Sequence, residues 1–117
     1  MSHRALQSAE LGGVRLRNRF IKTATYEGMS PGGRVSDALI AHHAQMAANG
    51  VALTTVAYAA VSPDGRTFGD QLLVDRDNVP GLRRLTDAVH ERGGLASLQL
   101  GHCGGFSKNK EVRGGRP

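Results

Sequence analysis

The sequence predicts an α/β fold in which parallel strands alternate with helices, about three strand–helix steps in all. Two segments, 51–60 and 95–100, are short, apolar and bounded by glycine or turn residues, which is typical of buried strands. Two others, 36–49 and a segment that starts at Pro80, repeat apolar residues every three or four positions, the period of a helix packed on one side. This alternation predicts a parallel sheet with right-handed crossovers.

The N-terminal part contributes one further strand. Residues 1–10 are polar, and we expect them to be loose. The segment 11–21 alternates between apolar and polar residues, which predicts a short surface strand or turn, and it leads into a buried strand over about 19–24. Glycines and a proline within 28–33 predict a loop.

The first helix has clear signals at both ends. Ser36 or Asp37 can cap its N-terminus, and Asn49 with Gly50 marks its C-terminal end. The strand that follows, 51–60, is β-branched and almost uncharged, as a buried strand should be. The helix residues expected to face the core are Leu39, Ile40, His43, Met46 and Ala47.

The second half repeats the pattern once more. A turn at 62–65 and a loop at 67–78 separate the second strand from the second helix. Pro80 opens that helix at a position where its missing N–H has no partner to lose, and Gly93–Gly94 end it. The third strand follows directly.

Length and composition indicate one soluble domain. The chain has 117 residues, 39% apolar and 21% charged, which is ordinary for a globular protein. We assign residues 1–117 to one domain, with 106–117 as an irregular basic tail. The net charge of +5 is spread along the chain, and the tail has few aromatic residues for base stacking, so we expect no binding to nucleic acid.

Three further observations concern the cellular compartment. Cys103 is the only cysteine, which excludes an internal disulfide and fits a reducing compartment. No apolar run approaches the roughly 20 residues that span a bilayer, and the first residues lack the apolar stretch of a signal peptide. We therefore expect a cytoplasmic protein with no membrane partner.

One polar residue interrupts the third strand near its C-terminal end. Gln99 lies where barrels and open α/β sheets hold their ligands. Its amide offers a donor and an acceptor together, which suits a heterocycle edge carrying a carbonyl beside an N–H. Taken alone, Gln99 fits a hydrogen-bonded core amide better than a ligand contact.

No metal site is expected. His42 and His43 are adjacent on a helix, so their side chains should point in different directions and belong to the surface or the core. His102 with Cys103 supplies too few ligands for tetrahedral zinc. The aspartates within 70–77 fit a solvated loop. Asp64–Gly65–Arg66 fits a turn, although Arg66 could reach a ligand from its loop.

Three sequence blocks carry a resemblance to a known family. They are LRNRFIKTAT (16–25), VSPDGR (61–66), and HERGG (90–94) leading into QLGHCG (99–104). In this order and at these spacings, residues 11–105 are similar to the N-terminal part of the Old Yellow Enzyme family, the FMN-dependent NADH:flavin oxidoreductases and NADH oxidases.

The resemblance implies a (β/α)8 TIM barrel with FMN across its C-terminal mouth. This chain would supply about the first three β/α units of that barrel. It would contact the flavin from the ends of three strands, through small side chains and backbone groups that permit close approach. The residues so implied are Thr23, Ala24, Thr25 and Tyr26, then Ala57 or Tyr58, and finally Gln99.

Three positions depart from the family pattern. Tyr26 falls where many members carry Cys or Thr near a flavin carbonyl. Tyr58 stands where a small residue is usual, and Gly105 where an Arg often follows. The catalytic residues remain unknown. His102, expected to line the barrel mouth, is the one candidate.

The resemblance implies an enzyme that transfers hydride from NADH or NADPH through FMN to a small-molecule acceptor such as an activated alkene. A barrel of this type needs about 250 residues. We therefore expect a fragment of a longer reading frame that is inactive alone, and a full-length parent that is a candidate homo-oligomer.

Two other functions stay open from the residues themselves. A small non-enzymatic α/β module could bind a partner along its open sheet edge. The basic tail could instead contact nucleic acid. Neither accounts for three motifs that fall at strand ends in the family's order.

Overall fold

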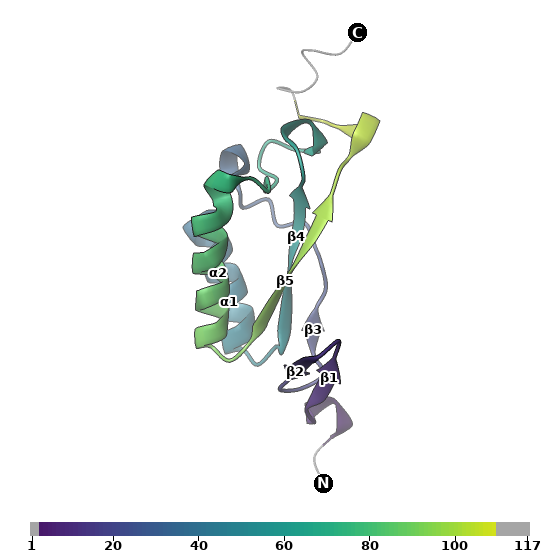
Figure 1. Ribbon diagram of the computed structural model, residues 1–117, viewed down its shortest axis with the longest axis vertical. Helices are drawn as coiled ribbons and strands as arrows, with labels where there is room; N and C mark the ends of the chain where they lie inside the picture. Colours follow the sequence, from purple (N-terminus) through teal and green to yellow (C-terminus); the bar gives the residue numbers. More distant parts are fainter. Residues whose placement is uncertain (1–2, 110–117) are drawn as a thin grey trace.

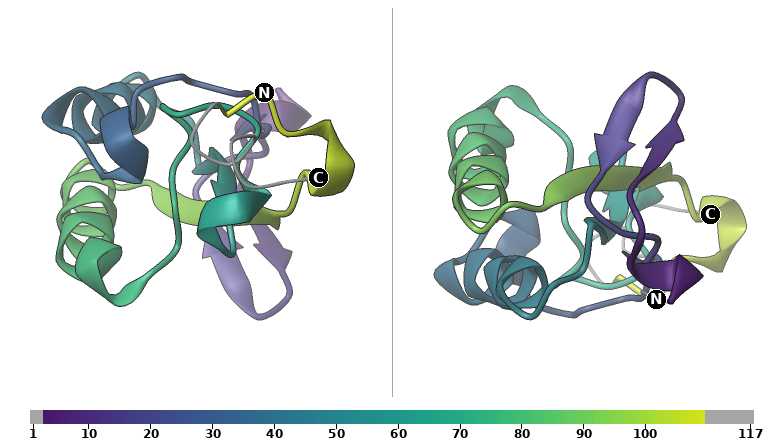
Figure 2. Two further views of the ribbon diagram at one scale, coloured as in Figure 1. Left: turned by 90° about the horizontal axis from the view of Figure 1, so that it is seen from above. Right: turned by 90° about the horizontal axis from the view of Figure 1, so that it is seen from below.

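A three-stranded parallel sheet with both helices on one face forms the body of the molecule. The computed structural model describes residues 3–109. The sheet order is β3 (Ile21–Lys22), β4 (Leu53–Ala60) and β5 (Leu95–Gly101), and all pairs are parallel. Helices α1 (Asp37–Ala48) and α2 (Val79–Glu91) lie on the same side of this sheet (Figures 1 and 2). The α/β class and the element order predicted from the sequence are confirmed.

A separate hairpin precedes the sheet. Strands β1 (Ala9–Leu11) and β2 (Val14–Leu16) pair antiparallel across Gly12–Gly13, whose φ angles of +56° and +80° suit a two-residue hairpin turn. A short 3-10 helix, Arg4–Leu6, comes before it. The expectation that residues 1–10 are loose is therefore wrong for most of the described part, because the turn lets 9–11 pair with 14–16.

The caps of α1 are those that the sequence predicts. The Ser36 hydroxyl accepts a hydrogen bond from the Leu39 N–H at 3.0 Å, which satisfies one of the free amides of the first turn. Gly50, at φ +101°, follows the last turn. The predicted inward stripe is partly confirmed, since Leu39, His43 and Ala47 are buried.

The core lies between the helices and the sheet. Its apolar members come from both helices, from β4 and from the loop before α2. They are Leu39, Ala47, Val56, Ala59, Leu72, Leu85 and Val89.

The first sequence block ties the helix C-termini to the hairpin. The Arg17 guanidinium donates to carbonyls at the ends of both helices, those of Ala47, Val51 and Arg92. Such a cation also complements the partial negative charge of helix C-termini. The Asn18 amide donates to the Gly50 carbonyl at 2.7 Å. This block therefore closes the end of the sheet remote from the strand C-termini.

The loop between β4 and α2 is packed rather than solvated. Gln71, Leu72 and Leu73 are buried, and Leu73 forms an isolated parallel bridge with Ala60. Backbone hydrogen bonds from the Ala60 N–H to the Leu72 carbonyl and from the Val74 N–H to the Ala60 carbonyl place this loop against the end of β4. An irregular segment can be buried when its backbone groups are paired in this way.

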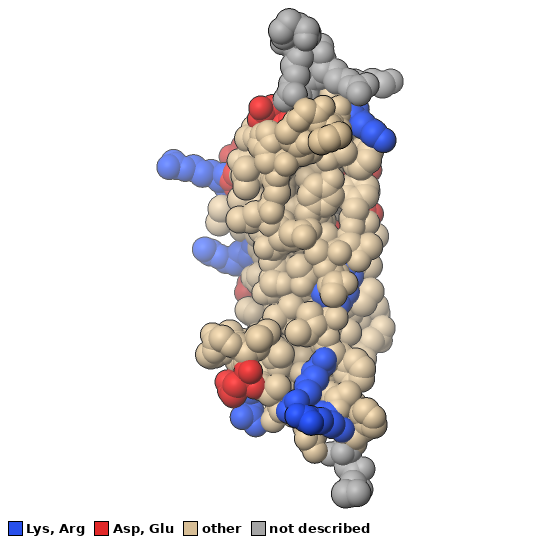
Figure 3. All heavy atoms as spheres, turned by 90° about the vertical axis from the view of Figure 1, so that its right-hand side faces the viewer, with Lys and Arg blue, Asp and Glu red and all other residues tan. Residues whose placement is uncertain are grey.

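The prediction that 95–100 is a buried strand is wrong within this chain. β5 is an edge strand, and Leu100 is 58% exposed. The face opposite the helices carries few charged side chains over most of its area (Figure 3). An uncovered, largely uncharged face fits a sheet that further strands complete.

Two remaining expectations concern the tail and the membrane. Only 106–109 of the predicted tail 106–117 are described, and Ser107 and Asn109 are buried there. Within residues 3–109, no helix is long and apolar enough to cross a membrane.

Candidate functional site

A bulge lies at the C-terminal end of the sheet. Val56 pairs with Leu98 and Ala59 with Leu100, so the two residues Ala57 and Tyr58 stand opposite the single residue Gln99. Bulges are rare in parallel pairs, and they concentrate at barrel rims and beside active sites. The register therefore places the predicted residues of the second and third strands together, across one irregularity.

The predicted residues of the first strand follow β3 in extended backbone. Thr23, Thr25 and Tyr26 are exposed, and Ala24 is half-buried. The next residue, Glu27, reaches the bulge, because its Oε1 atom accepts a hydrogen bond from the Ala57 N–H at 3.2 Å. Segment 23–27 thus runs alongside the end of β4.

The candidate residues divide between two neighbouring hollows. One, of about 500 Å³, is lined by Tyr58, Gln99 and His102 among others. The second, of about 290 Å³, is lined by Thr25 and Tyr26 together with Lys22, Glu27, Met29 and His42. Thr23, Ala24 and the buried Ala57 line neither hollow.

An aromatic cluster connects the two hollows. The Tyr26 ring lies 6.0 Å from that of Tyr58 and 5.1 Å from that of Phe68, between centroids. The Tyr26 hydroxyl donates to the Asp70 carboxylate, and the Tyr58 hydroxyl donates to Thr67 Oγ1 at 2.7 Å. Burial raises the pKa of Tyr26, and the hydrogen bond to Asp70 raises it further, so this hydroxyl keeps its proton.

Gln99 is exposed, so the interpretation as a hydrogen-bonded core amide is wrong. Among the described residues, no hydrogen bond involves its side chain. The reason is topological, since the edge position of β5 leaves no element over this side chain. One layer earlier, Thr55 Oγ1 and Ser97 Oγ share a hydrogen bond of 2.7 Å across the two strands.

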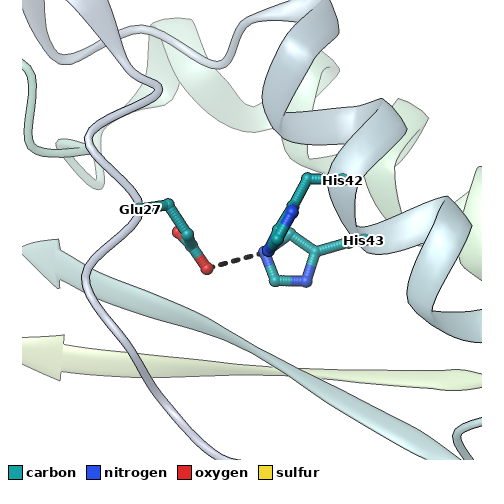
Figure 4. Close-up of side chains that lie close together, drawn as sticks. All are labelled: Glu27, His42 and His43. Atoms are coloured by element: carbon teal, nitrogen blue, oxygen red, sulfur yellow. Dashed lines mark hydrogen bonds and ion pairs between the residues drawn. The ribbon is translucent and has the colours of Figure 1, made fainter.

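A buried acid–histidine pair was missed by the sequence analysis. His43 is fully buried, and its Nε2 atom lies 2.8 Å from Glu27 Oε1 (Figure 4). Its Nδ1 atom lies 2.7 Å from Thr54 Oγ1. The prediction that His43 belongs to the core is confirmed. The only signal for its partner was a carboxylate just beyond the first strand, which no local pattern connects to the helix.

The two adjacent histidines approach the same carboxylate despite their different directions. One ligand atom from each of Glu27, His42 and His43 falls within 4.8 Å of the others. The closeness of Glu27 and His43 is explained by their own hydrogen bond. The Lys22 ammonium also lies 3.9 Å from Glu27 Oε1, where it would repel a bound cation. Desolvation lowers the pKa of His42, and the neighbouring His43 lowers it further.

His102 lies on the loop after β5, at the rim of the larger hollow. Its Nδ1 atom accepts a hydrogen bond from the Gly104 N–H at 3.0 Å, and its Nε2 atom is 3.7 Å from Asp64 Oδ1. A Cβ atom at Gly65 would come within 2.6 Å of the His102 ring, so any other residue there would displace that ring. The second and third sequence blocks therefore dock against each other through this contact.

Arg66 does not reach the hollows. Its side chain is buried and donates to the Pro63 carbonyl at 3.4 Å and the Gly69 carbonyl at 3.2 Å. Arg66 thus holds its own loop, which agrees with the interpretation of residues 64–66 as a turn, and its side chain does not line either hollow.

Comparison with known proteins relates this geometry to one enzyme family. The family model described as NADH:flavin oxidoreductase / NADH oxidase matches residues 7–115. A 4,4'-dithiodibutanoate disulfide reductase from Rhodococcus erythropolis is 57% identical over 98 residues, which are 84% of this chain and 24% of that protein. An NADPH dehydrogenase from Halalkalibacterium halodurans is 31% identical over 107 residues, 89% of this chain and 32% of that protein.

Solved structures agree. A morphinone reductase superposes with a TM-score of 0.81 at 25% identity, covering 88% of this chain and 27% of that one. The Old Yellow Enzyme from Trypanosoma cruzi superposes with a TM-score of 0.80 at 26% identity, covering 89% and 28%. These proteins are TIM barrels, so the chain has the fold of the N-terminal part of such a barrel. It spans about a quarter of the curated relative from Rhodococcus erythropolis.

Proposed function

Because the chain belongs to the NADH:flavin oxidoreductase / NADH oxidase family, whose members use FMN with NADH or NADPH as the reductant, we propose that it forms part of the flavin-binding face of an FMN-dependent oxidoreductase. Bound FMN would supply hydride acceptance and donation, which no protein side chain provides. The residues of this chain would bind and orient that group.

The observation that carries the proposal is the free Gln99 amide opposite the β4 bulge. An exposed amide at the carboxyl end of a parallel strand can both donate to and accept from the edge of a heterocycle. The buried Ala57 lines neither hollow, so in this proposal it would contribute only through its backbone, opposite Gln99 in the bulge. The exposed amide and the hollow of about 500 Å³ that Gln99 lines fit a flavin.

The remaining predicted residues take supporting roles in this proposal. Thr23, Ala24 and Thr25 present small side chains and backbone groups from the end of β3. Tyr26 is held by Asp70, so it offers an aromatic face where many family members carry Cys or Thr. His102 lines the larger hollow, and we assign it no step.

The acceptor is proposed to be a small molecule of one of two classes. An activated alkene is the acceptor that the family resemblance implies. A small organic disulfide is the second candidate, because the Rhodococcus erythropolis relative, a disulfide reductase by name, is 57% identical over 84% of this chain. Rates with NADPH and each acceptor, measured on the whole protein that carries this chain, separate the two.

The experiment that tests flavin binding replaces Gln99 by Leu. We expect FMN to bind roughly 10- to 100-fold more weakly, since two hydrogen bonds to a ring edge are lost. Gln45→Leu is the matched control, because Gln45 is an exposed amide on α1, outside both hollows. Equal FMN affinity of Q99L and wild type would contradict the assignment of Gln99.

We also propose that the 117 residues alone have no oxidoreductase activity. The edge of β5 and the open face of the sheet would be uncovered, which favours association over a defined flavin site. A stoichiometric yellow complex of the isolated chain that oxidises NADPH would refute this. A non-enzymatic module remains the alternative, supported only by the open edge of β5.

A further inference from the structure

The bulge in β4 decides which backbone groups face the flavin side of the sheet. If the pairing of Val56 with Leu98 continued without interruption, Ala57 would pair with Gln99 and Tyr58 with Leu100. Instead Ala59 pairs with Leu100, so one extra residue is accommodated. A shift of one residue moves the following side chains to the opposite face of a strand. The conformation at 57–58 therefore needs a cause.

A carboxylate from the segment after β3 contacts the bulge. The N–H of Ala57, the first residue of the bulge, donates to Glu27 Oε1 at 3.2 Å. The Glu27 side chain is only 5% exposed, so the acceptor is shielded from water that could replace it. A buried carboxylate is stable only when hydrogen-bonded, and the same oxygen also contacts His43 Nε2 at 2.8 Å.

His43 links Glu27 to a second residue of β4, Thr54. With Nε2–H donating to Glu27, the Nδ1 atom accepts from the Thr54 hydroxyl, which lies 2.7 Å away. The hydrogen bonds thus run from Thr54 through His43 and Glu27 to the Ala57 amide. They begin and end on the same strand, on either side of Val56.

We propose that Glu27 is a positioning residue that holds the β4 bulge open and thereby sets the backbone of Ala57 and Tyr58 against Gln99. The inference rests on the proposed flavin site, which this backbone would border. Glu27 touches neither the flavin nor the substrate in this scheme. His43 and Thr54 fix the direction of its carboxylate.

The test uses the whole protein that carries this chain and compares Glu27→Leu with Glu27→Gln. Leucine removes the acceptor, whereas glutamine keeps an oxygen that can accept from both Ala57 and His43. Glu10→Leu is the matched control, because the Glu10 side chain is 62% exposed on the hairpin. Two quantities are measured: hydrogen exchange of the Ala57 amide without flavin, and the Kd for FMN.

For E27L we expect Ala57 exchange to accelerate about tenfold and the FMN Kd to rise about tenfold, the effect of one lost hydrogen bond. E27Q and E10L should stay within about threefold of wild type in both quantities. If E27L does not fold, E27D takes its place. Its shorter carboxylate should accelerate exchange at Ala57 while distant amides in β1 and β2 remain unchanged.

The outcomes separate this inference from the proposed function. Wild-type protein that binds no FMN would overturn the flavin site, while the exchange data would still decide whether Glu27 holds the bulge. Wild-type protein that binds FMN, together with an E27L variant of equal affinity, would overturn the positioning role. Unchanged Ala57 exchange in E27L and E27D would overturn it as well.

Discussion

Asn78 offers the sharpest stability prediction. Its side chain is 3% exposed and joins three segments. The Nδ2 atom donates to the Gly33 carbonyl at 2.7 Å and the Leu73 carbonyl at 2.6 Å, and Oδ1 accepts from the Val35 N–H at 3.0 Å. Asn78→Ala would remove the partners of the Val35 N–H and the Leu73 carbonyl, whereas the Gly33 carbonyl still accepts from the Leu73 N–H at 3.0 Å. At about 1–3 kcal/mol for each buried group, we expect a loss of about 2–4 kcal/mol in the free energy of unfolding.

Urea denaturation followed by circular dichroism measures this loss in the whole protein. Asp77→Ala is the control, because Asp77 is an exposed neighbour in the same short helix, and it should change the free energy by less than about 0.5 kcal/mol. Asn78→Asp should lose at least as much as N78A, since a carboxylate cannot donate to two carbonyls. A loss below about 1 kcal/mol in N78A would refute the reasoning.

Three further outcomes follow from other contacts. The pKa of Tyr26 is raised in the folded state, so the folded protein keeps this proton where the unfolded chain loses it, and stability should fall as pH rises above about 10. Y26F should make this fall in stability less steep between pH 9 and 11 in thermal melts. An identical pH dependence in Y26F and wild type would contradict the prediction. The pKa of His42 is lowered in the folded state, so stability should fall as pH drops below about 6.5. H42Q should reduce this pH dependence of stability between pH 7.5 and 5.5, as measured by urea denaturation. The same pH dependence in H42Q and wild type would refute the shift. Arg17→Met removes the hydrogen bonds to both helix C-termini and should lower the free energy of unfolding by about 1–2 kcal/mol, as measured by urea denaturation. Arg83→Met, at an exposed position, is the control and should leave stability unchanged. Equal stability of the two variants would show that water replaces the guanidinium.

The sequence predicted the elements well where the signal was local. The cap at Ser36 and the glycines after each helix are read from neighbouring residues, and α1 lies within one residue of its predicted bounds. The hairpin was only half predicted, because residues 1–10 were expected to be loose, whereas Ala9 and Glu10 pair with Leu16 and Arg15. The packed loop containing Leu72 was missed for the same reason, since its hydrogen-bond partner Ala60 is distant along the chain.

For the candidate site, too, the sequence predicted the positions of residues along the strands but not the contacts between strands. The location of Gln99 at the carboxyl end of a strand, and of Thr23–Tyr26 at another, followed from the order of strands in a parallel sheet. Their contacts with a flavin stay a prediction. The bulge at Ala57 could not be foreseen, because it depends on which residue of β5 stands opposite.

The sequence by itself determined the alternation of strands and helices, the family, and the end of the sheet where polar groups collect, because periodicity and short motifs are properties of adjacent residues. Tertiary structure alone decided that Glu27 meets His43 and Ala57 and that β5 is an exposed edge. Those outcomes depend on register and packing between segments up to about 40 residues apart, and an isolated stretch of chain has no information about what will lie across from it.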